Sequence, residues 1–151
     1  MVNSSETHWH KPHEGEHRLS VSLSVVLVIA LQFLLPKHLS LGIQRYICVL
    51  EAALLVVLVT LTPRRIGRHH APTRNLSIVL TSVMTVSNIS SAIKLIDGLV
   101  QGSITDANML LLSGGSIWMA DVVIFSLWFW ELDRGGPGAR AEARKPVPDF
   151  L

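Results

Sequence analysis

The sequence predicts an all-α integral membrane protein with four transmembrane helices in a bundle and both termini in the cytoplasm. Two observations predict this fold class: 49% of the 151 residues are hydrophobic, and most of them gather in four long apolar stretches. Charged residues make up 16% of the chain, against about 25% in ordinary soluble domains. A span of about 20 residues crosses the hydrocarbon, and it is expected to be helical because lipid cannot satisfy backbone polar groups.

The four predicted spans cover residues 19–36, 43–62, 76–100 and 109–130. Pro36, Pro63 and the segment QGSITDAN separate them, as helix stops and turns should. The first span is followed by no small-residue cleavage site, which favours a transmembrane helix over a signal peptide. A transmembrane domain is thus predicted over residues 19–134. It lies between a disordered, His-rich segment at 1–18 and a Gly/Pro/Arg-rich cytoplasmic tail at 135–151.

Basic residues lie in three segments that should face the same side of the membrane. They are Lys11 and Arg18; Arg64, Arg65, Arg68 and Arg74; and Arg134, Arg140, Arg144 and Lys145. The other two loops carry only Lys37 and Asp106 as Lys, Arg, Asp or Glu residues. The positive-inside rule therefore places both termini and the middle loop in the cytoplasm. The net charge is +2, and the basic residues lie in short clusters between the apolar stretches, as membrane orientation requires. No nucleic-acid partner is therefore predicted.

Ionisable residues at membrane depth are costly and often functional. The predicted spans hold four candidates: Glu51, Lys94, Asp97 and Asp121. Glu51 shares one helical face with Cys48 and Gln44. In the third span, a polar stripe falls within an arc of about 120° and consists of Ser87, Ser90, Ser91, Lys94 and Asp97.

Three carboxylates accompany one lysine, so at least one acid is expected to lack a cationic partner. The helical rise places Glu51 roughly 12 Å and Asp121 roughly 18 Å below the outer boundary, with Lys94 within about 10 Å of it. A structural interpretation pairs Lys94 with Glu51, or turns Lys94 outward beside Asp97, and bonds Asp121 to a serine or a tryptophan N–H. The alternatives are an ion or proton pathway and contacts with a partner subunit.

Small residues in the fourth span predict close helix packing. They form the segment SGGS at 113–116, followed by Ala120. Packing within the bundle and a homo-oligomer interface are both compatible with this pattern. The lipid bilayer is the expected surroundings in either case.

Histidines near the N-terminus form a candidate metal site. His8, His10, His13 and His17 lie within ten residues, and neutral imidazoles at such spacing bind Zn²⁺, Ni²⁺ or Cu²⁺. The alternative is a polar tail that binds metal weakly or not at all. The single cysteine, Cys48, excludes an intrachain disulfide and a CxxC metal site.

The end of the fourth span combines aromatic and charged residues. Trp128 and Trp130 match the aromatic belt at a membrane interface, and Glu131, Asp133 and Arg134 follow where water begins. Acids at a helix C-terminus are disfavoured by the helix dipole. We therefore predict a basic partner for Glu131 or Asp133, chosen among Arg64, Arg65, Arg68 and Arg74.

The stretch WFWELDRGGP, at residues 128–137, resembles a family of uncharacterised bacterial multi-pass membrane proteins with a W-x-W-E-x-D-x-G-G-P signature. The closing PDFL is similar to a segment of that family, in which the chain continues into further spans. The resemblance implies a location in a bacterial inner membrane, and it implies that this chain is a shortened form. Some members carry an ion-channel-like label, but the TVGYG potassium filter is absent here.

The sequence contains no GxSxG, HExxH, P-loop or Rossmann pattern, so we expect a protein without enzymatic activity or a cofactor. The leading hypothesis is a structural or accessory membrane protein. One alternative is a small ion or proton transporter or channel component that uses Glu51, Lys94 and Asp121. A second is a metal-responsive membrane protein that uses the His-rich tail.

Overall fold

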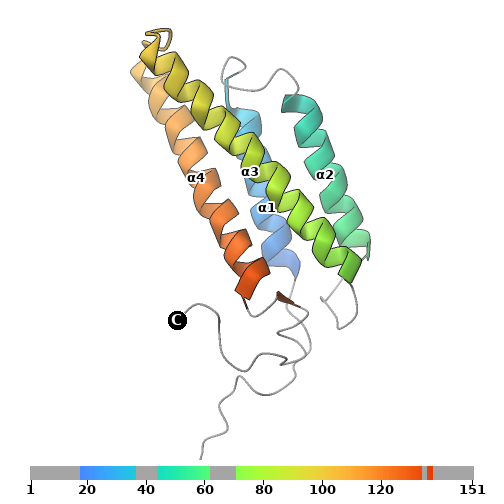
Figure 1. The fold of residues 1–151 in the computed structure, drawn as a ribbon. Coiled ribbons are helices and arrows are strands. Elements are labelled where there is room, and N and C mark those ends of the chain that lie inside the picture. Colours follow the sequence, from blue (N-terminus) through green and yellow to red (C-terminus); the bar gives the residue numbers. More distant parts are fainter. Residues whose placement is uncertain (1–17, 37–43, 62–70, 134–135, 138–151) are drawn as a thin grey trace, which may run out of the picture.

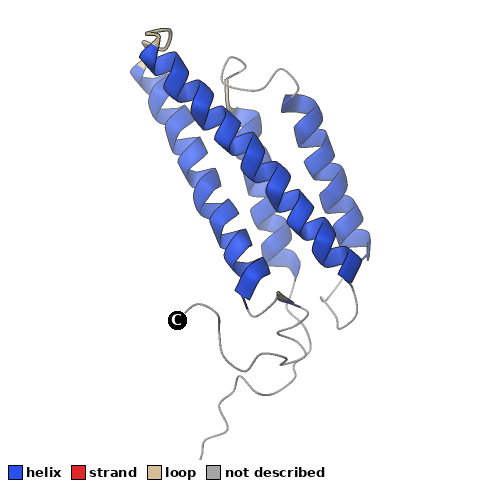
Figure 2. Ribbon diagram, viewed as in Figure 1, coloured by secondary structure: helices blue, strands red, loops and turns tan. Residues whose placement is uncertain are grey.

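The computed structural model describes residues 18–36, 44–61, 71–133 and 136–137. Four helices account for nearly all of this part of the chain: α1 (Arg18–Leu34), α2 (Gln44–Leu61), α3 (Ala71–Val100) and α4 (Ala107–Leu132) (Figures 1 and 2). The predicted all-α class is therefore confirmed.

The helices form a bundle in which consecutive helices run in opposite directions (Figure 1). Helix α3 packs against α2 and α4, and α1 packs against the same two helices. The N-terminal end of α3 and the C-terminal end of α4 consequently lie at the same end of the bundle. This arrangement brings Arg74 and Glu131 within reach of each other.

Helix boundaries follow the proline positions. Helix α1 ends at Leu34, two residues before Pro36, because the residue preceding a proline is driven out of the helical region. Helix α3 begins at Ala71, earlier than the predicted span, with Pro72 in its first turn, where a missing N–H leaves no bond unmade. Arg74 therefore belongs to a helix and not to the loop.

The distribution of polar and apolar side chains differs from that in a water-soluble bundle. Large hydrophobic residues are exposed on all four helices, among them Leu23, Phe33, Val56, Val86, Ile93, Trp118 and Phe125. The buried residues include an apolar cluster around Val28, Leu58, Met84 and Ile124. They also include many polar side chains, and Glu51 has no exposed surface at all.

Three helices are long and apolar enough to cross a membrane: α2, α3 from Thr73 to Val100, and α4. Helix α1 is apolar but shorter, with 17 residues in total. Its length corresponds to about 25 Å, which is somewhat less than the hydrocarbon thickness.

Candidate functional site

A buried polar cluster joins helices α1, α2 and α3. Its five members are Gln32, Gln44, Cys48, Glu51 and Ser87, which we call the Glu51 cluster. The side chain of Gln32 lies at its centre. The Gln32 Nε2 donates to Glu51 Oε1 at 3.3 Å. The Gln32 Oε1 accepts from Gln44 Nε2 at 2.8 Å, from Ser87 Oγ at 3.1 Å and from the Cys48 thiol at 3.7 Å.

All five side chains are buried, with relative exposures from 0% for Glu51 to 7% for Gln44. The Gln44 Nε2 also donates to Ser87 Oγ at 2.9 Å, which ties α2 directly to α3. Two acceptors of the cluster, Glu51 Oε2 and Gln44 Oε1, are buried without a hydrogen-bond partner. The cluster therefore contains more acceptor atoms than donors to satisfy them.

The helical period predicts that Gln44, Cys48 and Glu51 share one face of a helix, and the structure buries all three. The salt bridge considered between Lys94 and Glu51 does not form. The Glu51 carboxyl contacts Gln32 instead. Gln32 was missed by the sequence reasoning, although it is the only residue with an amide side chain in the first predicted span and so carried a signal.

Asp121 forms a separate contact between α3 and α4. The Asn88 Nδ2 donates to Asp121 Oδ1 at 2.7 Å and to the Ile117 carbonyl oxygen at 3.2 Å. The predicted serine or tryptophan donor to Asp121 is thus wrong, and the donor is an asparagine. Asn88 directly follows Ser87 in the sequence but lies outside the predicted polar stripe, and the two side chains contact different neighbouring helices.

The structure does not gather the intramembrane candidates into one site. Glu51 lies in the α1–α2–α3 cluster and Asp121 in the α3–α4 contact, and no hydrogen bond joins the two acids. Lys94 is half-buried on α3, and Asp97 is exposed near the end of the same helix. Sequence spacing places residues on faces, but it cannot say which neighbouring helix each face meets.

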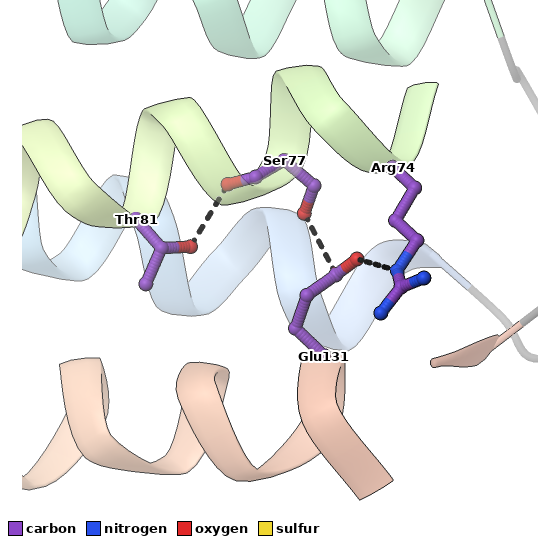
Figure 3. Close-up of polar contacts among 4 residues, drawn as sticks. All are labelled: Arg74, Ser77, Thr81 and Glu131. Atoms are coloured by element: carbon purple, nitrogen blue, oxygen red, sulfur yellow. Dashed lines mark hydrogen bonds and ion pairs between the residues drawn. The ribbon is translucent and has the colours of Figure 1, made fainter. Parts of the chain in front are cut away.

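The predicted basic partner at the end of α4 is confirmed. The Arg74 Nε lies 3.8 Å from Glu131 Oε1, and Ser77 Oγ donates to Glu131 Oε2 at 3.0 Å. Figure 3 shows both α3 side chains directed at the carboxylate. Glu131 is 1% exposed, whereas the Arg74 side chain is 46% exposed. The Glu131 carboxylate therefore lies inside the bundle, and the partly exposed Arg74 side chain reaches it from the edge of the bundle.

The other candidate residues at the end of α4 lie in different surroundings. The Trp128 Nε1 donates to Thr85 Oγ1 at 3.0 Å, and Trp130 is half-buried. Asp133 ends α4, with its backbone N–H donating to the Phe129 carbonyl oxygen. Arg134 lies outside the described residues. The end of α4 thus combines a contact that packs it against α3, at Trp128, with one that ends the helix, at Asp133.

The histidines proposed as metal ligands, His8, His10, His13 and His17, also lie outside the described residues. Within the part of the chain that the structure describes, no group of three or more His, Cys, Asp or Glu side chains could hold a metal ion. The small-residue segment of α4 is partly buried. Ser113 and Ala120 face the core, whereas Gly115 has open space where a Cβ would lie.

The fold and its contacts define a helical bundle with three membrane-length helices, an apolar exterior and polar clusters inside. A comparison of the chain with protein-family models, characterised proteins and solved structures finds no match.

Proposed function

We propose that the protein is a multi-pass membrane protein with a structural or accessory role and no enzymatic activity. Four spans cross a bacterial inner membrane and both termini lie in the cytoplasm. The observation that carries the proposal is the side-chain distribution, with large hydrophobic residues exposed on all four helices and Gln32, Glu51 and Asn88 buried inside. An apolar surface that extends over all four helices is far larger than a soluble monomer tolerates, whereas it suits contact with lipid tails.

Helix α1 is included as the fourth span because its outward face is as apolar as those of the other helices. Leu19, Leu23, Phe33 and Leu34 are all exposed. A 17-residue helix is a few ångströms short of the hydrocarbon thickness, and local thinning of the bilayer accommodates that mismatch at small cost. Four antiparallel spans then return the chain to the side on which it began.

The buried polar contacts support a structural role. Each helix is tied to a neighbour by at least one side-chain hydrogen bond, from Gln32–Glu51 and Gln44–Ser87 to Asn88–Asp121. Glu51, Asp121 and Glu131 lie in three separate contacts. Each of these acids bonds a residue of a neighbouring helix, which is the role expected of a structural residue.

Cysteine labelling of intact cells tests the topology. In a Cys48→Ser background, single cysteines at Ser4, Ser40, Gly67, Ser103 and Ala143 are treated with a membrane-impermeant maleimide. We expect labelling at positions 40 and 103 only, with the others reacting after the cells are opened. Labelling of position 67 in intact cells would refute the proposed orientation, and equal labelling at 4 and 40 would remove α1 as a span.

A second candidate function is ion or proton transport with Glu51, Lys94 and Asp121. One observation favours it: a carboxyl oxygen of Glu51 is buried inside the bundle without a donor. Proton and cation flux into liposomes is compared for the wild type, Glu51→Gln and Asp121→Asn. Flux above background that either substitution abolishes supports transport. Equal background flux in all three removes it.

A further inference from the structure

The Glu51 carboxyl lies in a closed environment of neutral side chains. Its exposure is 0%, and the described side chains bonded to it or to its partner Gln32 are two amides, a thiol and a hydroxyl. No Lys or Arg of the described residues forms a salt bridge with it. A lone carboxylate in such surroundings costs many kcal/mol, so its charge must be compensated.

Two buried oxygens without a hydrogen-bond partner indicate what compensates the charge of the carboxylate. Glu51 Oε2 and Gln44 Oε1 are both acceptors, and both belong to side chains that bond to Gln32. An acceptor is satisfied by a proton donor or by a cation, and not by another neutral acceptor. Ser87 Oγ is a further oxygen of the cluster, which accepts from Gln44 Nε2 and donates to Gln32 Oε1.

From these contacts we propose that the Glu51 cluster binds one monovalent cation, either a proton on the Glu51 carboxyl or an alkali metal ion coordinated by oxygens of Glu51, Gln44 and Ser87. A single charge matches the single carboxylate and leaves the cluster neutral. A divalent cation would leave one uncompensated positive charge inside the bundle, which the same desolvation argument excludes. The oxygens are hard ligands, which suits H⁺, Na⁺ or K⁺ better than a soft metal.

Other ionisable groups near the cluster are few, and the Arg45 and Tyr46 side chains, which follow Gln44 on α2, are exposed. Cys48 contacts Gln32 from the same helix as Glu51. The described part of α1 beyond Arg18 has no ionisable side chain, and α3 carries Lys94 two turns beyond Ser87. Asp121 on α4 is held by Asn88. Glu51 is therefore the acid that a cation entering this cluster would neutralise. The inference concerns binding alone: it is independent of the structural role, and it shares the unpartnered Glu51 oxygen with the transport candidate.

Infrared difference spectroscopy of the full chain in liposomes tests the proposal. Spectra of the wild type are compared with those of Glu51→Gln, with Asp121→Asn as the control for the other intramembrane acid. Near neutral pH and without alkali metal ions, we expect a carbonyl band of a neutral carboxyl group that Glu51→Gln removes and Asp121→Asn retains. If this band persists on addition of Na⁺ or K⁺, the cation is a proton. If a carboxylate band replaces it with saturable dependence on one of these ions, the cation is that ion.

Two further variants keep the test valid if Glu51→Gln fails to fold. Gln32→Leu removes the donor to Glu51 Oε1, so in the proton case the wild-type band moves to higher frequency. Ser87→Ala removes a coordinating oxygen, so in the metal case the apparent affinity falls by about tenfold. The proposal is overturned if the Glu51 signal is that of a carboxylate over the whole accessible pH range and does not respond to H⁺, Na⁺ or K⁺.

Discussion

Gly136 lies against the ion pair at the end of the bundle. Its backbone φ is +94°, a conformation that residues with a Cβ rarely adopt. A Cβ at this position would lie 3.0 Å from the Glu131 carbonyl oxygen and 3.4 Å from Arg74 Nε. The second glycine of the GGP turn is thus explained by the backbone conformation and by the close approach of Arg74 and Glu131.

We predict that Gly136→Ala destabilises the protein by about 2 kcal/mol, through backbone strain and crowding of the Arg74–Glu131 pair. Gly102→Ala is the matched control, because Gly102 also has a positive φ, of 67°, but nothing lies within 4 Å of its Cβ position. Its cost should be about 1 kcal/mol, from the backbone alone. Unfolding free energies in detergent measure both, and equal losses would contradict the role of close approach.

At the scale of the elements, α3 and α4 are joined by polar contacts along their length. Asn88 bonds Asp121, Thr85 accepts from Trp128, and Ser77 bonds Glu131. The contacts recur at intervals of three and eight residues on α3, which keeps them on the side that faces α4. In lipid, where burial of apolar surface provides no driving force between helices, such contacts and close packing hold a helix pair together.

Asn88→Ala is predicted to weaken the α3–α4 pair by about 1 kcal/mol, because one amide makes two interhelical bonds, to Asp121 Oδ1 and to the Ile117 carbonyl oxygen. Ser90→Ala serves as the control. The Ser90 hydroxyl bonds only the Val86 carbonyl oxygen of its own helix, so its removal should change stability little. Steric trapping of the α3–α4 pair measures the difference, and similar values for both variants would argue against Asn88 as a helix-joining residue.

At the scale of the whole molecule, the apolar exterior determines whether the protein is stable in water or in a bilayer. Val86 is 63% exposed near the middle of α3, and Val100 is 81% exposed at the end of the same helix. In water, an arginine at either position would be tolerated. In a bilayer the two positions differ in depth, and only the end of the helix lets a long side chain reach the headgroups.

Val86→Arg should therefore make the free energy of membrane insertion less favourable by about 3 kcal/mol. Val100→Arg should cost much less, because the guanidinium reaches the interface. The inserted fraction of each variant in a membrane-integration assay gives the comparison. If both variants insert as well as the wild type, α3 does not cross the hydrocarbon in the way proposed here.

The sequence by itself determined the helical class, the approximate helix positions and the buried face of α2. These follow from local patterns: apolar length, prolines and the 3.6-residue period that places Gln44, Cys48 and Glu51 together. It also indicated a basic partner for Glu131, because two acids at a helix C-terminus call for compensation whatever the fold.

Only the tertiary structure decided which polar side chains meet. Lys94 and Glu51 have compatible charges and similar estimated depths, yet Glu51 contacts Gln32, and Asp121 contacts Asn88 instead of a serine or a tryptophan. The physical reason is that partner choice depends on the rotation of each helix about its axis and on which helices are neighbours. Both are set by packing across the whole bundle.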